Sequence, residues 1–129
     1  MKLFNSLFGV SDDEHTDSKV AWKPLTNVSQ LEAIIKESAQ KPVVIFKHST
    51  RCGISRMALK RFEGEFNLQD KVTPYFLDLL QHRDVSDSVS QHFNVMHQSP
   101  QLLLIVDGKC VYDESHGDID AESLQKKVS

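Results

Sequence analysis

The sequence has few of the residues that mark disulfide-stabilised proteins. Only two cysteines occur in 129 residues. That number cannot supply the dense disulfide framework of a small secreted domain, and it fits a reducing compartment such as the cytoplasm better. The chain also lacks internal repeats and low-complexity tracts. With 40% hydrophobic residues, it is long enough for one ordinary domain with its own core.

An excess of positive charge and long apolar runs are absent as well. The 15 basic residues are outnumbered by 18 acidic ones, which gives a net charge of −3. A broad basic face for nucleic acid is therefore not expected. No apolar stretch approaches the roughly 20 residues that span a bilayer, so we expect no stable membrane association.

The first 20 residues differ in character from the rest. Residues 1–10 contain one lysine and several large apolar side chains, interrupted by Asn5 and Ser6, and residues 11–18 are polar and acidic. The apolar part is too short for the three regions of a signal peptide. We interpret residues 1–20 as a flexible N-terminal extension and residues 21–129 as the folded domain, in a cytoplasmic protein.

Helical and strand-like patterns alternate along the predicted domain. Asp84 and Asp120 are capping candidates at the starts of two later helices. The helix from Cys52 to about Phe66 should bury a stripe made of Ile54, Met57 or Ala58, Arg61 or Phe62, and Phe66. An earlier helix, the first of the domain, has Asn27 or Ser29 as its capping candidate. The expected strands are Val43–Lys47, Thr73–Leu77, Gln101–Val106 and Lys109–Tyr112, the last two joined by the hairpin signal Asp107-Gly108.

This order predicts an α/β fold with a central mixed sheet of about four strands flanked by helices. The first two strands are joined through a helix and should be parallel, whereas the hairpin adds an antiparallel pair. A cysteine at the first strand-to-helix junction, with an X-Pro pair just before the hairpin, is the plan of the thioredoxin-like fold.

Cys52 is the strongest candidate for chemistry. The strand Val43–Lys47 leads directly into His48-Ser49-Thr50-Arg51-Cys52, which opens a helix. Unpaired backbone N–H groups and the positive end of the helix dipole favour a thiolate at such a position, and the thiolate is the nucleophile of disulfide exchange. Ser55 stands where a second cysteine often occurs, so the site is interpreted as a one-cysteine redox centre.

Several short segments together resemble one family. They are Lys47–Ser55, Ser99-Pro100-Gln101, Asp107-Gly108-Lys109 and Ser115-His116. In this order, and over residues 22 to the C-terminus, they are similar to the YtxJ-type monothiol bacilliredoxins. The resemblance implies a thioredoxin-like fold, a link to the low-molecular-weight thiol bacillithiol, Cys52 as redox cysteine and Pro100 as a cis-proline facing it. The family usually has proline after the cysteine, where this chain has Gly53.

The remaining site residues are weighed individually. Ser55 can donate a hydrogen bond to the thiolate or be an ordinary first-turn serine. Arg51 is a better candidate than Arg56 for holding the thiolate or the carboxylates of bacillithiol. Cys110 alternates with Val111 in a strand and is interpreted as a small apolar filler. We therefore expect Cys52 and Ser55 to be catalytic, substrate to be bound by Thr50, Arg51, Ser99 and Pro100, and no metal site.

The predicted function is that of a thiol–disulfide oxidoreductase that removes bacillithiol or a similar small thiol from S-thiolated client proteins. Bacillithiol would be a co-substrate, with no tightly bound cofactor, and the protein would act as a monomer. Two alternatives remain open. Cys52-Gly53-Ile54-Ser55 also resembles the CGFS motif of monothiol glutaredoxins that bind iron–sulfur clusters, although the other elements of that family are missing. The second alternative is a binding module that uses the thioredoxin groove and has no redox activity.

Overall fold

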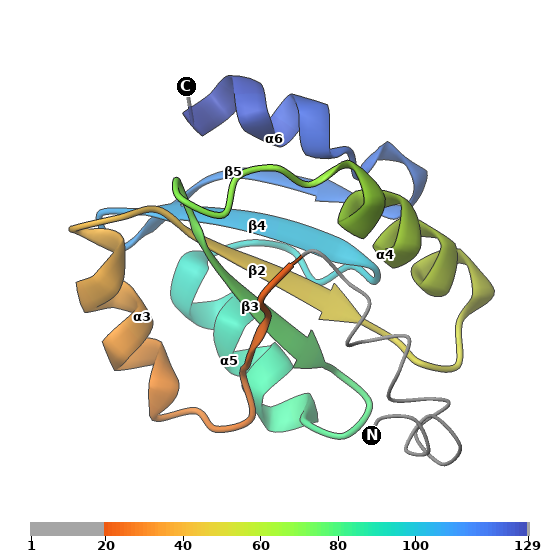
Figure 1. Cartoon of the computed structure of the whole chain (residues 1–129). Helices are drawn as coiled ribbons and strands as arrows, with labels where there is room; N and C mark the ends of the chain where they lie inside the picture. The colour runs from red at the N-terminus through yellow and green to blue at the C-terminus, as the bar shows by residue number, and fades with distance from the viewer. Residues whose placement is uncertain (1–19, 129) are drawn as a thin grey trace, which may run out of the picture.

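The computed structural model describes residues 20–128, and Figure 1 shows how their helices and strands are arranged. The expected sheet and flanking helices are present. Four α-helices occur in this part of the chain: α3 (Gln30–Ser38), α4 (Gly53–Glu65), α5 (Arg83–Phe93) and α6 (Ala121–Val128). The strands are β1 (Lys23–Pro24), β2 (Val43–His48), β3 (Thr73–Asp78), β4 (Gln101–Val106) and β5 (Lys109–Ser115), and the 3₁₀ helix η1 (His116–Asp118) follows β5.

The five strands form one mixed sheet in the order β1-β3-β2-β4-β5. β2 and β3 are parallel, whereas β4 runs antiparallel to both β2 and β5. The predicted α/β class and thioredoxin-like plan are confirmed. The strand that the sequence pattern did not show is β1, because two residues are too few for any periodicity.

Helices cover both faces of the sheet, α3 and α5 on one side and α4 and α6 on the other (Figure 1). Every residue of the central strand β2 is buried, as its run of apolar residues predicts. The larger aromatic side chains, Phe46, Phe62 and Phe66 among them, lie in the core on the α4 and α6 side. The middle of the sheet is therefore fixed from both faces.

Turns and helix ends follow the sequence signals in most places. Asp107 and Gly108 both have positive φ, 54° and 80°, as the two-residue hairpin requires. Asp120 accepts the N–H of Glu122 at 3.2 Å and so caps α6. The prediction that Asp84 caps α5 is wrong: the helix begins at Arg83, one residue earlier, and His82 occupies the N-cap position.

The predicted N-terminal extension lies outside the described residues, except for Val20. That side chain is 4% exposed and belongs to the core on the α4 and α6 side. Two residues later in the chain, the indole N–H of Trp22 donates to Glu63 of α4 at 2.7 Å. The start of the described chain is therefore fixed to the α4 side of the sheet.

Candidate functional site

Cys52 lies at the start of α4, as predicted. Its backbone is extended, with φ −105° and ψ 122°, and it occupies the N-cap position. Its N–H donates to Ser49 O at 3.1 Å, and its carbonyl accepts the N–H of Arg56 at 3.0 Å. The thiol is half-buried and free. The chain thus presents one thiol at a helix N-terminus, next to the unpaired N–H groups of the first turn.

Ser55 is fully buried, and its hydroxyl has two partners. It accepts the backbone N–H of Ser49 at 3.0 Å and lies 2.8 Å from Nδ1 of His48. His48 is itself 5% exposed, at the end of β2. These bonds fasten the loop before Cys52 to the first turn of α4. The sequence did not reveal the His48–Ser55 pair, and a contact between Ser55 and the thiolate stays a prediction.

The predicted substrate-binding residues Thr50 and Arg51 are both exposed on the loop that precedes Cys52. Arg56 is tied to this loop, because its Nη1 donates to the carbonyl of Thr50 at 3.1 Å. Arg51 therefore remains the stronger candidate for an incoming anion. Nothing in these contacts assigns either arginine a substrate, so their roles stay predictions.

The peptide bond between Ser99 and Pro100 is cis, as the resemblance implied. The carbonyl of Pro100 accepts the N–H of His116 at 3.0 Å, which joins the loop before β4 to the end of β5. The Ser99 hydroxyl oxygen is buried and has no hydrogen-bond partner within residues 20–128. Because buried polar groups are normally paired, this orphan hydroxyl requires an explanation.

Strand register gathers these segments at one end of the sheet. Lys47 pairs with Gln101, and Gln101 pairs with Ser115. The loop from β2 to Cys52, the Ser99-Pro100 pair and the turn after β5 therefore leave the sheet at the same edge.

Cys110 lies toward the opposite end. It pairs with Ile105, which pairs with Val43 at the beginning of β2. His48 lies five residues after Val43, which corresponds to about 17 Å along β2. Cys110 is half-buried in the core on the α3 and α5 side, and burial raises the pKa of its thiol. Its predicted role as an apolar filler fits this placement, and a role as resolving thiol does not.

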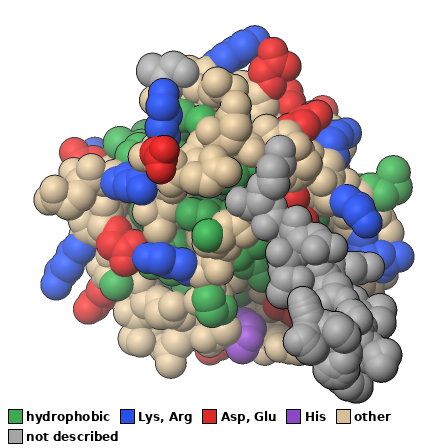
Figure 2. Space-filling view, viewed as in Figure 1, with side chains coloured by type: hydrophobic (Ala, Val, Ile, Leu, Met, Phe, Trp, Pro, Cys, Tyr) green, Lys and Arg blue, Asp and Glu red, His purple; other side chains and the backbone are tan. Residues whose placement is uncertain are grey.

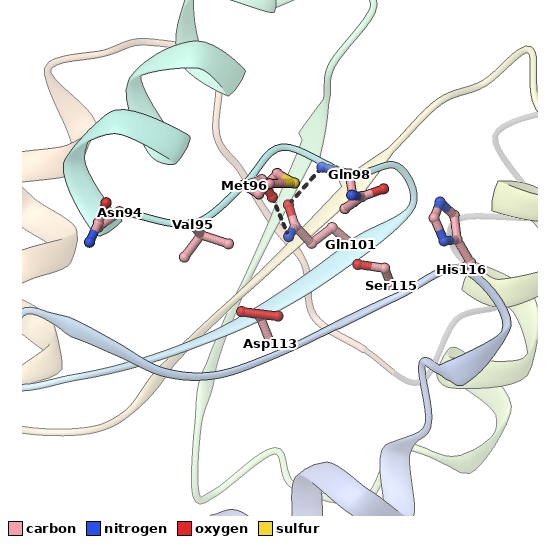
Figure 3. Close-up of a pocket in the computed structure, with 8 residues that line it drawn as sticks. All are labelled: Asn94, Val95, Met96, Gln98, Gln101, Asp113, Ser115 and His116. Carbon is pink, nitrogen blue, oxygen red and sulfur yellow. Dashed lines mark hydrogen bonds between the residues drawn. The ribbon is translucent and has the colours of Figure 1, made fainter.

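A polar groove of about 440 Å³ opens beside the cis-proline loop (Figure 3). Residues from the end of α5, the following loop, and the strands β4 and β5 surround it. None of them was predicted as a site residue: Asn94, Val95, Met96, Gln98, Gln101, Asp113, Ser115 and His116. One sequence signal for this groove was available. Asp113 and Ser115 are two residues apart, so a strand there places both polar side chains on the same face.

On α4 and in the loop before β4, three large apolar side chains are exposed. Ile54 and Met57 of α4 are 58% and 74% exposed, and Met96 of the loop before β4 is 79% exposed. The prediction that α4 buries Ile54 is therefore wrong, and of the two alternatives Met57 and Ala58 it is Ala58 that is buried. The helix buries Ser55, Ala58, Leu59 and Phe62, so its buried face begins at Ser55 and not at Ile54.

No group of three His, Cys, Asp or Glu side chains that could hold a metal ion occurs among residues 20–128. In the same range, no helix is long and apolar enough to cross a bilayer. Figure 2 shows Lys and Arg side chains interspersed with Asp and Glu over the face drawn, in agreement with the small net charge.

Comparison with known proteins agrees with this geometry. The family model described as "Monothiol bacilliredoxin BrxC" matches residues 23–124, which include Cys52, the cis-proline and the turn after β5. The chain belongs to the monothiol bacilliredoxin family. As a bacilliredoxin, it has thiol–disulfide redox chemistry as its general function, and the one-cysteine interpretation of the site accords with that.

Solved structures place the bacilliredoxin among thioredoxin-fold proteins. A protein described as a candidate oxidoreductase with a thioredoxin fold is 37% identical, with a TM-score of 0.70, over 80% of this chain and 89% of that one. Thioredoxin from Malassezia sympodialis is 19% identical over 86% and 90% of the two chains, with a TM-score of 0.66. Thioredoxin from Fasciola hepatica is 21% identical over 82% and 95%, with a TM-score of 0.65. The last two show the fold alone.

Proposed function

We propose that this protein removes bacillithiol, or a similar small thiol, from mixed disulfides with client proteins, and that Cys52 is the nucleophile. The observation that carries the proposal is a single free thiol at the N-terminus of α4, with Ser55 three residues later and Cys110 toward the other end of the sheet. Such a site can accept a thiol but has no neighbouring cysteine to expel it.

The reaction balances as two disulfide exchanges. The Cys52 thiolate attacks the small-thiol sulfur of the mixed disulfide, forms a bond with it, and expels the client as a thiolate. Cys52 then carries the small thiol as a disulfide. A second thiolate, from another small thiol or another redoxin, attacks that sulfur and releases Cys52 as a thiolate. No net oxidant is needed, because the electrons come from the second thiol.

Substrate binding is assigned to the surfaces around Cys52. Arg51 and Thr50 offer a charge and a hydroxyl beside the thiol, and the unpartnered Ser99 hydroxyl next to the cis-proline can be satisfied by a bound substrate. Exposed Ile54 and Met57 add apolar contact area for a client protein. We place this activity in the cytoplasm, in a monomer that works without a tightly bound cofactor.

The test is removal of bacillithiol from a single-cysteine reporter protein, with release of the reporter thiol as the readout. Cys52→Ser should abolish the activity, and Cys110→Ser should retain most of it. A Cys110 variant as inactive as the Cys52 variant would replace the one-cysteine mechanism with a two-cysteine one. A wild-type protein that leaves the reporter bacillithiolated would contradict the proposed function.

A further inference from the structure

Lys47 is an unusual member of the sheet, because its side chain has no exposed surface. Lysine is among the residues least often buried, since transfer of an ammonium group from water is costly. In the described part of the chain its hydrogen-bond partners are neutral: Nζ lies 2.9 Å from Nδ1 of His97 and 3.3 Å from the Ser90 hydroxyl. An apolar side chain in this place would avoid the cost.

The bond to His97 fixes how the imidazole is protonated. An ammonium group only donates, so Nδ1 must accept and the ring must be neutral, with its proton on Nε2. Partial desolvation on its inner side lowers the pKa of His97 below 6.5, and the nearby Lys47 lowers it further, while Asp87 raises it and Arg83 lowers it. Desolvation also lowers the pKa of Lys47 to about 8, although Asp87 opposes this. Near pH 7 the pair is therefore a charged lysine and a neutral histidine.

His97 belongs to the loop that carries the cis-proline. It is exposed, whereas Lys47 is buried, so the imidazole is the outermost member of the cluster. Ser99 and Pro100 follow two and three residues later. The Lys47–His97 bond thus ties this loop to β2, the strand that leads to Cys52.

Gln101 holds the same loop from its other side. Its side chain is 1% exposed, donates to the carbonyl of Met96 at 3.0 Å and accepts the N–H of Gln98 at 3.3 Å. Figure 3 shows both bonds across the turn of the loop. Gln101 is also the strand partner of Lys47. Lys47 and Gln101, two buried side chains on adjacent strands, therefore hydrogen-bond to three consecutive loop residues, 96–98, directly before Ser99.

We propose that Lys47 and His97 are positioning residues for the exchange reaction, and that their hydrogen bond holds the loop before the cis-proline in the orientation that receives a mixed disulfide at Cys52. The inference rests on the proposed function. Neither side chain needs to touch the reacting sulfurs. Their effect passes through the loop to Ser99 and Pro100, which leave the sheet at the same edge as Cys52.

The test compares four variants with the wild type. His97→Leu and Lys47→Met remove the bond, His97→Asn keeps an amide oxygen that can accept from Lys47, and His92→Leu is an exposed control on α5. We expect the first two to lower the rate constant with a bacillithiolated reporter about tenfold or more, because small displacements at a reacting centre are costly. His97→Asn and His92→Leu should stay within about threefold of the wild type.

Two further measurements distinguish a loss of loop positioning from a general disruption of the fold. Alkylation of Cys52 by iodoacetamide should be nearly unchanged in all variants, because the thiol itself is intact. Amide hydrogen exchange at Gln98 should accelerate in His97→Leu and not in His97→Asn. The ratio of wild-type to His97→Asn rates should also fall once the pH drops through the lowered pKa of His97, where the wild-type imidazole gains a proton and can no longer accept from Lys47.

Equal rates for His97→Leu and the wild type would overturn the inference, as would equal slowing by His97→Leu and His97→Asn. A wild type that is inactive on the reporter would overturn the proposed function instead. In that case the exchange rate at Gln98 still reports whether Lys47 and His97 hold the loop.

Discussion

At the scale of single residues, the site combines exposed polar side chains before the nucleophile, Thr50 and Arg51, with two buried polar groups, His48 and Ser55. Cys52 is only half-buried, but Ser55 and His48 behind it are almost completely enclosed. Because a buried hydroxyl with two partners is hard to replace, the local structure before Cys52 depends on Ser55.

Ser55→Ala should lower the free energy of unfolding by about 1–3 kcal/mol, because the N–H of Ser49 and Nδ1 of His48 lose a buried partner. Urea unfolding followed by circular dichroism measures the change. Ser29→Ala, which alters an exposed serine, should cost less. Equal losses in the two variants would mean that the Ser55 hydrogen bonds contribute nothing specific.

Ser55→Cys tests the spacing of the site. Residue 55 lies in the first turn of the helix that Cys52 caps, so a thiol there should resolve an adduct on Cys52 and form an intramolecular disulfide on oxidation. Digestion of the oxidised variant under non-reducing conditions, followed by mass spectrometry, detects the linked peptides. Persistence of the small-thiol adduct on Cys52, with no link to position 55, would show that the two side chains cannot meet.

Lys47 provides a pH-dependent prediction. Its pKa of about 8 lies below the value of 10.5 expected in the unfolded chain, so the unfolded state binds more protons between these pH values. This group therefore destabilises the fold fully below pH 8 and progressively less as pH rises toward 10.5. Lys47→Met should be more stable than the wild type at pH 7, by up to about 4 kcal/mol.

The advantage of Lys47→Met should shrink between pH 8 and 10.5. Comparing the two proteins cancels the effect of Tyr75 and Tyr112, whose pKa values burial raises to about 12 and which act above pH 10 in both. Thermal unfolding at several pH values measures the difference. A difference that does not change with pH would mean that Lys47 has an ordinary pKa in the folded protein.

At the scale of elements, the hairpin between β4 and β5 is anchored to the end of α3. The N–H of Gly108 donates to the Ser38 hydroxyl at 2.7 Å, and the N–H of Asp107 donates to the Ser38 carbonyl at 2.9 Å. Gly108 has a φ of +80°, and a Cβ there would lie 3.2 Å from the side chain of Ile35. Glycine is therefore required for both conformation and space.

Gly108→Ala should destabilise the protein by about 1–2 kcal/mol, because the left-handed conformation is strained for alanine. Gly64→Ala is the matched control, since Gly64 lies inside α4 and its Cβ would meet nothing within 4 Å. That change should be neutral or stabilising by up to about 1 kcal/mol. Melting temperatures of the two variants that move in the same direction would contradict this account of the hairpin.

Local sequence patterns predicted most of the helices, strands and turns. They gave the wrong result where the burial of a side chain depends on a residue far away in the sequence. The strand from Val43 and the turn at Asp107-Gly108 have strong local patterns, and both were predicted correctly. The start of the buried face of α4 was misjudged, because Ser55 counts as polar in any periodicity. Its partner His48 lies in another element, so tertiary structure decides that the serine faces inward and Ile54 outward.

At the scale of the whole molecule, the mixed sheet brings three separate segments to one edge. The thioredoxin-like arrangement and the position of Cys52 at a strand-to-helix junction could be predicted from the order of elements. The groove beside the cis-proline could not, because Asn94, Gln101 and Asp113 come from different elements and become neighbours only after the strands pair. The buried Lys47 was also missed, since a lysine that ends an apolar run normally marks the end of a strand.

The central claim is that Cys52 takes up the small thiol and releases the client protein reduced. It is tested most directly by intact-mass spectrometry after the reduced protein is mixed with one equivalent of a bacillithiolated single-cysteine reporter. The account predicts a protein heavier by one bacillithiol on Cys52, together with an unmodified reporter thiol. A covalent complex between Cys52 and the reporter, or a bacillithiol adduct on Cys110 instead of Cys52, would contradict it.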